Sequence, residues 1–231
     1  MMIKKQLQKI LKHRFLLKLL IRPVEEGYTD SKIYFVNVDP KSISHISLLP
    51  ESSPGLSGPE ALYGSFTGFF DLIKTPFKKN FMYRSVQQIL NGQDFKSTPY
   101  FKKESKNENE AEALKHIEKL NGLMERLSVF GYLSQYEMGR ANIIDKIGDW
   151  DVPRHETLIG MDRHGQFFRI KGGRHQLAIA QNIGIKEIPA ILVFYHQDAE
   201  EKLPEKRRII TEKMEDFRPF EKEECEVEQV K

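Results

Sequence analysis

Two hydrophobic patterns alternate along the 231-residue chain. In some segments apolar residues recur about every 3.6 residues, and in others they form short continuous runs rich in β-branched and aromatic residues. Helical spacing predicts amphipathic helices over residues 2–22, 81–90 and 110–127. Runs rich in β-branched and aromatic residues predict strands over residues 33–38, 43–49, 156–161, 166–170 and 190–195. We therefore expect an α/β (α+β) fold with a small mixed sheet and flanking helices.

The segment 169–180 predicts a strand, a two-glycine turn and the start of a helix. Glycines such as Gly172 and Gly173 let a backbone turn tightly and approach a ligand closely. The first N–H groups of a helix lack partners and lie at the positive end of its dipole, so this turn is typical of a phosphate-binding loop. Arg174 and His175 would add side-chain donors at the same place.

Beyond this turn the chain predicts a short apolar helix, a stop at Gly184, an Ile-Pro pair and a buried strand. On residues 173–180 and 183–189 this order resembles the ParB/sulfiredoxin superfamily, which implies a small mixed sheet of that type. A weaker resemblance covers residues 33–196 and points to uncharacterised ParB-like proteins of prokaryotic and viral genomes, often encoded among surface-polysaccharide genes. Its motifs are Val38-Asp39-Pro40, Gly68-Phe69-Phe70-Asp71, Tyr83-Arg84, Gly92, Thr98-Pro99-Tyr100 and Gly131-Tyr132-Leu133-Ser134-Gln135.

The loop departs from the superfamily pattern at three positions. Members that transfer phosphate to a small molecule usually carry Asp where this chain has Gly172, and Arg where it has Gln176. Sulfiredoxins carry a reactive Cys where this chain has Arg174. Without a thiolate at that position their reductase chemistry is excluded. The loop also lacks an acidic group that could act on a hydroxyl or a metal.

The resemblance adds two candidates outside the loop. Asp71 stands at an acidic position of the ParB-like relatives and is, with His175, a candidate catalytic group; capping a turn is the alternative. Arg84 on the second predicted helix is a candidate phosphate ligand, although an exposed Arg is usually solvated. A metal bound by His155, His164 and His175 is not expected, because their spacing matches no helical ligand pair.

The chain predicts one main domain with appendages. Residues 1–26 form a basic amphipathic helix, residues 27–198 the ParB/sulfiredoxin-like domain with a helical insertion at about 80–147, and residues 199–231 a charged helix or tail. The 36 basic residues nearly cancel the 33 acidic ones, so composition alone does not indicate nucleic-acid binding. The single cysteine, Cys225, excludes an internal disulfide and fits a reducing compartment, so we expect a cytoplasmic protein.

The predicted N-terminal helix has two open interpretations. Its interleaved lysines exclude a membrane-spanning segment. Residues 2–22 could dock on the rest of the chain or on a partner protein, which is the favoured interpretation. They could also make peripheral contact with an anionic membrane surface.

Three functions are weighed for the glycine turn. The favoured one is a nucleotide- or phosphate-ligand-binding protein, with Gly172, Gly173, Arg174, His175 and Gln176 around the phosphate. If it were a phosphotransferase acting on a small hydroxyl compound, ATP, ADP or CTP with Mg²⁺ would be its cofactors. The alternatives are a nucleic-acid-associated ParB-like regulatory module and a non-catalytic binding scaffold. ParB proteins that clamp DNA need a downstream DNA-binding domain, and the segment 197–231 is too short and too acidic to form one.

Overall fold

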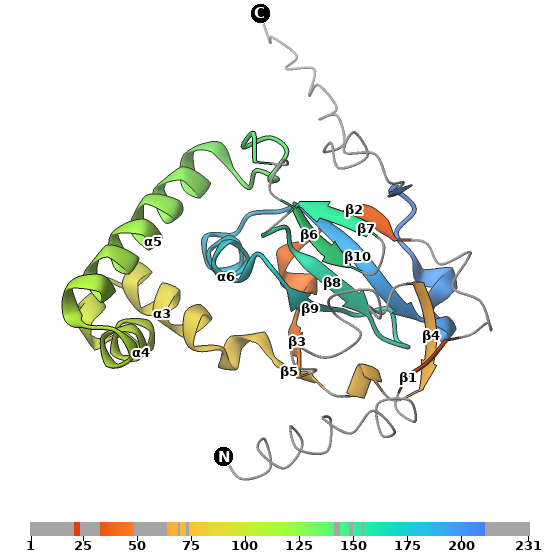
Figure 1. Ribbon diagram of the computed structural model, residues 1–231, viewed down its shortest axis with the longest axis horizontal. Helices are drawn as coiled ribbons and strands as arrows, with labels where there is room; N and C mark the ends of the chain where they lie inside the picture. The colour runs from red at the N-terminus through yellow and green to blue at the C-terminus, as the bar shows by residue number, and fades with distance from the viewer. Residues whose placement is uncertain are drawn as a thin grey trace, which may run out of the picture.

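A mixed β-sheet and a layer of helices lie on opposite sides of helix α6 (Arg174–Ile183) (Figure 1). The computed structural model describes residues 21–23, 33–48, 64–68, 70–72, 74–140, 144–147, 150–153 and 155–210. The helices of the layer are α3 (Phe81–Leu90), α4 (Pro99–Asn107) and α5 (Glu110–Phe130). The α/β class expected from the sequence is confirmed.

The sheet is built around β10 (Ile188–His196), in which every residue is buried. Its nearly continuous apolar sequence suits a strand covered on both faces. On one edge β10 runs parallel to β8 (Leu158–Met161). On the other edge its first half pairs antiparallel with β2 (Tyr34–Val38), and its last residues pair parallel with β4 (Gly64–Gly68).

The outer strands extend this centre in both directions. They are β1 (Ile21–Pro23), β3 (His45–Ser47), β5 (Lys74–Pro76), β9 (Phe167–Lys171) and β11 (Arg207–Ile209). From β8 the order continues through β9, β3 and β5, while β1 pairs with β4 and β11 pairs with β2. Within the described residues nine strands form this sheet, and β6 (Ile144–Ile147) and β7 (Trp150–Pro153) form a separate hairpin.

Side chains cap both the helices and the main hairpin. Asn80, Thr98 and Asn109 each accept a backbone N–H at the start of α3, α4 and α5. Between β8 and β9, Asp162 Oδ1 accepts the N–H groups of His164 (2.8 Å) and Gln166 (2.9 Å). These local caps fix where each helix begins and hold the turn between β8 and β9.

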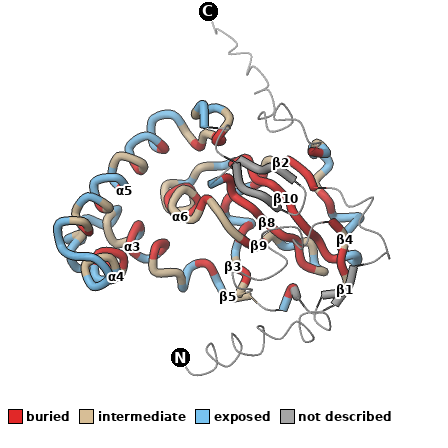
Figure 2. The backbone as a smooth tube through the Cα atoms, viewed as in Figure 1, coloured by how far each residue is buried: buried red, intermediate tan, exposed pale blue. Residues whose placement is uncertain are grey.

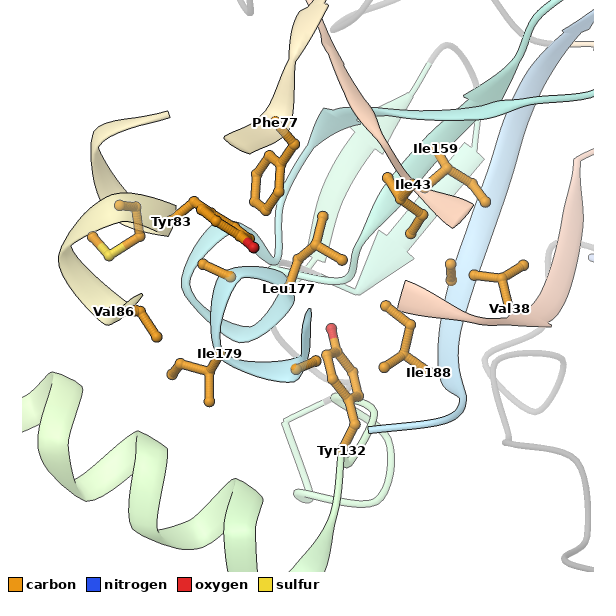
Figure 3. Close-up of a cluster of buried hydrophobic side chains, with 14 of the residues drawn as sticks. Val38, Ile43, Phe77, Tyr83, Val86, Tyr132, Ile159, Leu177, Ile179 and Ile188 are labelled. Carbon is orange, nitrogen blue, oxygen red and sulfur yellow. The ribbon is translucent and has the colours of Figure 1, made fainter. Parts of the chain in front are cut away.

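Helix α6 belongs to the core of both layers. Buried residues, shown red in Figure 2, follow α6 as well as β8 and β10. Figure 3 shows Leu177 and Ile179 of α6 among Tyr83 and Val86 of α3 and Ile188 of β10. Because apolar side chains cover both of its sides, α6 cannot rotate or shift without exposing apolar surface to water.

Two of the predicted helices agree with the structure, and one predicted linker does not. The range 81–90 coincides with α3, and α5 extends the range 110–127 to Phe130. The polar and charged composition of residues 102–109 predicts a linker, but most of these residues belong to α4. Thr98 caps this helix, and the burial of Tyr100 and Phe101 anchors it, which outweighs the polar composition of its later turns.

Four short strands lie where the sequence predicts other structure. Strand β4 lies in residues 50–68, whose content of Pro, Gly and Ser predicts a loop, and β7, which pairs with β6, lies in residues 149–155, where a loop is also predicted. Strand β11 pairs with β2 in the segment expected to begin a charged helix or tail at residue 199. Strand β1 holds the last residues of the predicted helix 2–22, whose earlier residues, like Cys225, lie outside the described part of the chain. Each of these strands depends on a partner strand, which local composition does not reveal.

The turn between β9 and α6 packs tightly against the residues before β8. Gly172 and Gly173 have φ angles of 65° and 51°. A Cβ atom on Gly172 would collide with the carbonyl of Glu156, and one on Gly173 with the hydroxyl of Thr157. The Gly173 N–H also donates to the His155 carbonyl at 3.1 Å. Glycine is therefore required at both positions by packing within the protein itself.

Comparing two glycines separates this packing constraint from backbone strain. Gly184 has a φ of 78° but open space around the position of a Cβ atom. Gly184→Ala should therefore lower the free energy of unfolding by about 1–2 kcal/mol, the cost of a left-handed residue. Gly172→Ala should cost about 3–5 kcal/mol, because a steric collision is added. Urea unfolding measures both losses, and equal losses would contradict the close approach.

Candidate functional site

A cavity of about 510 Å³ opens at the N-terminus of α6. Its walls come from the start of α4, one face of α5, the segment after α5, the segment before β8 and the first turn of α6. The lining residues are Tyr100, His116, Lys119, Leu120, Leu123, Arg126, Gln135, Met138, Arg140, His155, Gly173, Arg174, His175 and Gln176. The predicted glycine turn therefore forms one wall of a cavity whose other walls come from distant parts of the chain.

The cavity is electropositive. Four of its side chains carry a permanent positive charge, namely Lys119, Arg126, Arg140 and Arg174. None of the described residues that line it is acidic. Like charges gathered around a concave site raise the local potential and attract anions. The lining therefore suits an anionic ligand.

The first turn of α6 adds backbone donors to this wall. Leu177 N–H donates to the Gly173 carbonyl at 2.7 Å, which is the first hydrogen bond of the helix. No side chain caps the helix, and the N–H groups of Arg174, His175 and Gln176 have no partner among the described residues. Unpaired N–H groups at the positive end of a helix dipole bind anions.

Four of the predicted ligand-binding residues line this cavity: Gly173, Arg174, His175 and Gln176. Gly172 does not line it, and its carbonyl accepts a hydrogen bond from Arg169 Nε at 2.7 Å. The N–H of Gly173 is likewise occupied within the protein, by the carbonyl of residue 155. The glycines therefore position α6, and the unpaired donors come from the three residues that follow them.

Asp71 and Arg84 lie away from the cavity. Asp71 is 2% exposed and forms a two-pronged ion pair with Arg163, with Nε–Oδ2 and Nη2–Oδ1 distances of 2.7 and 2.8 Å. Burial works to raise the pKa of Asp71, but the hydrogen bonds and charge of Arg163 outweigh it and lower that pKa. Arg84 is exposed on α3. The expected grouping of Asp71 and Arg84 with His175 is not found, because Asp71 ties the segment before β5 to the β8–β9 turn.

His175 is largely buried against the ring of Tyr100, with ring centroids 5.7 Å apart. Burial, followed by the charges of Arg174 and Arg169, lowers the pKa of His175 to about 4. The imidazole is therefore neutral at pH 7, where it can donate or accept a hydrogen bond but adds no charge.

A buried carboxyl lies behind the cavity wall. Glu156 is 2% exposed, and its Oε1 accepts the Gln135 N–H at 2.6 Å. Its Oε2 has no hydrogen-bond partner among the described residues. Burial raises the pKa of Glu156 to about 7. The carboxyl is therefore half-protonated near neutral pH, and it supports the lining residue Gln135 from behind.

A chain of hydroxyl groups fixes Gln176. The hydroxyl of Tyr132 lies 2.8 Å from Thr157 Oγ1 and donates to Gln176 Oε1 at 3.4 Å. Tyr132 is buried, which raises its pKa, so this phenol stays protonated and can act as the donor. Gln176 therefore has a defined orientation at the position where the resemblance predicts an Arg.

One group of described side chains could hold a metal ion beside the cavity. Ligand atoms of Glu104, Glu108 and His116 lie within 4.8 Å of one another. In the structure, His116 Nε2 lies 3.4 Å from Glu108 Oε2, and Lys103 pairs with Glu104 at 3.2 Å. His116 also lines the cavity, so a cation held here would lie beside an anion bound in it. Of the three histidines considered from the sequence, His155 and His175 line the cavity and His164 does not.

The sequence did not single out Lys119, Arg126 and Arg140 as site residues. Helix α5 was assigned to the core by its apolar face, and the charges beside that face looked solvated. His155 carries a signal that only a structure reveals. His155 has a φ angle of 71°, and no other non-glycine residue in the described part of the chain has a positive φ. Residues with such strained backbone conformations are often found at functional sites.

Glu156 and His175 should give opposite pH dependences of stability. The folded state has the higher pKa at Glu156, about 7 against an ordinary 4.5, so this group's contribution to stability falls as the pH rises between those values. The folded state has the lower pKa at His175, about 4 against 6.5, so its contribution falls as the pH drops between those values.

Two variants test this opposition by urea unfolding at several pH values. Relative to wild type, the stability of Glu156→Gln should increase as the pH rises from 4.5 to 7. Relative to wild type, that of His175→Gln should increase as the pH drops from 6.5 to 4. Each slope is at most about 1.4 kcal/mol per pH unit. Profiles of both variants that run parallel to wild type would show that neither group is perturbed by burial.

Comparisons with protein-family models, curated proteins and solved structures give no match. The resemblance to the ParB/sulfiredoxin superfamily therefore stays a prediction. In the described part of the chain, no helix combines the length and the apolar character needed to cross a membrane.

Proposed function

We propose that this protein binds a phosphate-bearing small molecule of the nucleotide class in the cavity at the N-terminus of α6. The observation that carries the proposal is the lining, in which four permanent cations line the same cavity as three unpaired helical N–H groups and no described lining residue is acidic. Arginine and lysine with helix N–H groups are the donors that bind phosphate in proteins. The apolar side chains of Leu120, Leu123 and Met138 give a ribose or base a surface to contact.

The size of the cavity favours a small molecule over nucleic acid. Its volume of about 510 Å³ falls within the roughly 300–1,000 Å³ of ligand pockets. An extended stripe of basic residues on the surface suits a nucleic-acid backbone. The basic residues of this site line a concavity instead. The resemblance of the turn to the ParB/sulfiredoxin superfamily supports the same proposal. The chain has a single cysteine, Cys225, which fits a reducing compartment, and we propose the cytoplasm as its setting.

Binding is the function proposed, and phosphoryl transfer is not. Transfer to a hydroxyl benefits from a proton acceptor whose pKa lies near the working pH. The pKa of His175 is lowered to about 4, which makes it a weak acceptor at pH 7. Asp71, the other candidate catalytic group, is paired with Arg163 away from the cavity.

The proposal predicts ligand binding that depends on Arg174. Millimolar ATP, ADP or CTP, with or without Mg²⁺, should raise the melting temperature, since a ligand at 100 times its dissociation constant adds about 2.7 kcal/mol of stability. Arg174→Gln should weaken binding by about 10- to 150-fold, the value of a hydrogen bond to a charged group, in isothermal titration calorimetry.

Arg84→Gln is the matched control, because Arg84 is an exposed helical arginine outside the cavity. It should leave the affinity unchanged. No stabilisation by any nucleotide or by inorganic phosphate would remove the proposal. Equal losses of affinity in the two variants would show that the ligand binds elsewhere.

A further inference from the structure

We infer that the ligand carries two phosphate groups at separate positions, joined by an uncharged part, as in a nucleoside 3′,5′-bisphosphate. This inference rests on the proposed function and specifies its ligand. The observation behind it is that two of the basic lining residues, Lys119 and Arg126, lie two turns apart on α5, with the lining residue Leu123 between them.

Helix α5 sets the distance between the two ends. Lys119 and Arg126 both line the cavity and are seven residues apart, which is two turns of one helix face and about 10 Å along the axis. Leu123 lies between them on the same face and also lines the cavity. Each of the two basic residues can bind an anionic group of its own, and Leu123 offers no hydrogen-bond donor between them.

The first end joins Lys119 to the start of α6. The Arg174 guanidinium lies over the Phe81 ring, 5.1 Å from its centroid, and His175 lies edge-on to Tyr100. The Tyr100 ring also contacts His116, one turn before Lys119 on α5, with centroids 6.4 Å apart. These contacts place the start of α6 beside His116 on α5, and we assign Arg174, the neighbouring Lys119 and the unpaired N–H groups of α6 to one anion-binding end.

The second end comprises Arg126 in the last turns of α5 and residues of the segment that follows the helix. Arg140 N–H donates to the Gln135 carbonyl at 2.8 Å, so both residues belong to one turn that lines the cavity together with Arg126. Arg126 Nε donates to the Gly122 carbonyl at 3.3 Å, which holds this side chain along α5. Among the described residues, Lys119, Arg126 and Arg140 form no ion pair, so each can pair with an anionic ligand.

The apolar residues between the ends exclude a continuous phosphate chain as the best ligand. Leu120, Leu123 and Met138 offer no hydrogen-bond donor, so an oxyanion held against them would lose its hydration without compensation. A sugar or base fits there at no such cost. Phosphates on two different hydroxyls of one nucleoside keep the two charges apart, with ribose carbons between them and the base to one side.

The test compares three adenine nucleotides by isothermal titration calorimetry. Adenosine 3′,5′-bisphosphate should bind at least about tenfold more tightly than ADP, which has the same number of phosphates in one chain, and more tightly than AMP. Arg126→Gln and Arg140→Gln should each weaken bisphosphate binding by at least about tenfold and AMP binding by less than about threefold. Lys115→Gln is the control on α5, because Lys115 pairs with Glu112 and does not line the cavity.

Each outcome decides a different claim. If ADP binds as tightly as the bisphosphate, or if Arg126→Gln and Arg140→Gln weaken AMP and the bisphosphate equally, the two-ended ligand is wrong while phosphate binding stands. If none of the three nucleotides binds the wild-type protein, the proposed function and this inference both fail. Circular dichroism of the variants shows that they are folded, which is expected because both arginines are exposed.

Discussion

The close approach of two backbone segments determines the geometry of the whole site. Gly172 and Gly173 lie so near Glu156 and Thr157 that no side chain fits between them, and a hydrogen bond joins Gly173 N–H to the His155 carbonyl. This approach fixes the direction in which α6 leaves the sheet. Because α6 is then covered by apolar residues on both sides, its N-terminus has one position, and the cavity forms around it.

The same arrangement explains how the fold tolerates a cluster of like charges. Lys119, Arg126 and Arg140 are exposed, so water and salt weaken their mutual repulsion to about 1 kcal/mol or less per pair. Arg174 is half-buried, and the face of Phe81 stabilises its charge. An anionic ligand would reduce the remaining repulsion between these basic side chains. The same repulsion that slightly lowers the stability of the free protein therefore favours ligand binding.

The sequence predicted the parts of the site that are local and missed those that depend on tertiary contacts. The strand, glycine turn and helix around Gly173 can be predicted from residues that are neighbours in the sequence. The three residues after Gly173, namely Arg174, His175 and Gln176, were predicted as ligands and line the cavity. Lys119 could not be found in this way, because only the packing of α5 on α6 brings it to the cavity. Strand β11 was missed for a similar reason, since its pairing partner β2 lies far away in the sequence. Asp71 was singled out by resemblance, whereas its ion pair with Arg163 is a contact between distant segments.

Nuclear magnetic resonance of the backbone amides tests the central claim most directly. During a titration with pyrophosphate, the amide signals of Arg174, His175 and Gln176 should shift and saturate together, because their N–H groups are the unpaired donors at the start of α6. The amides of Asp71 and Arg163 should stay in place, since their ion pair lies away from the cavity. Saturating shifts at other residues, with the three α6 amides unchanged, would contradict the assignment of this helix terminus as the phosphate site.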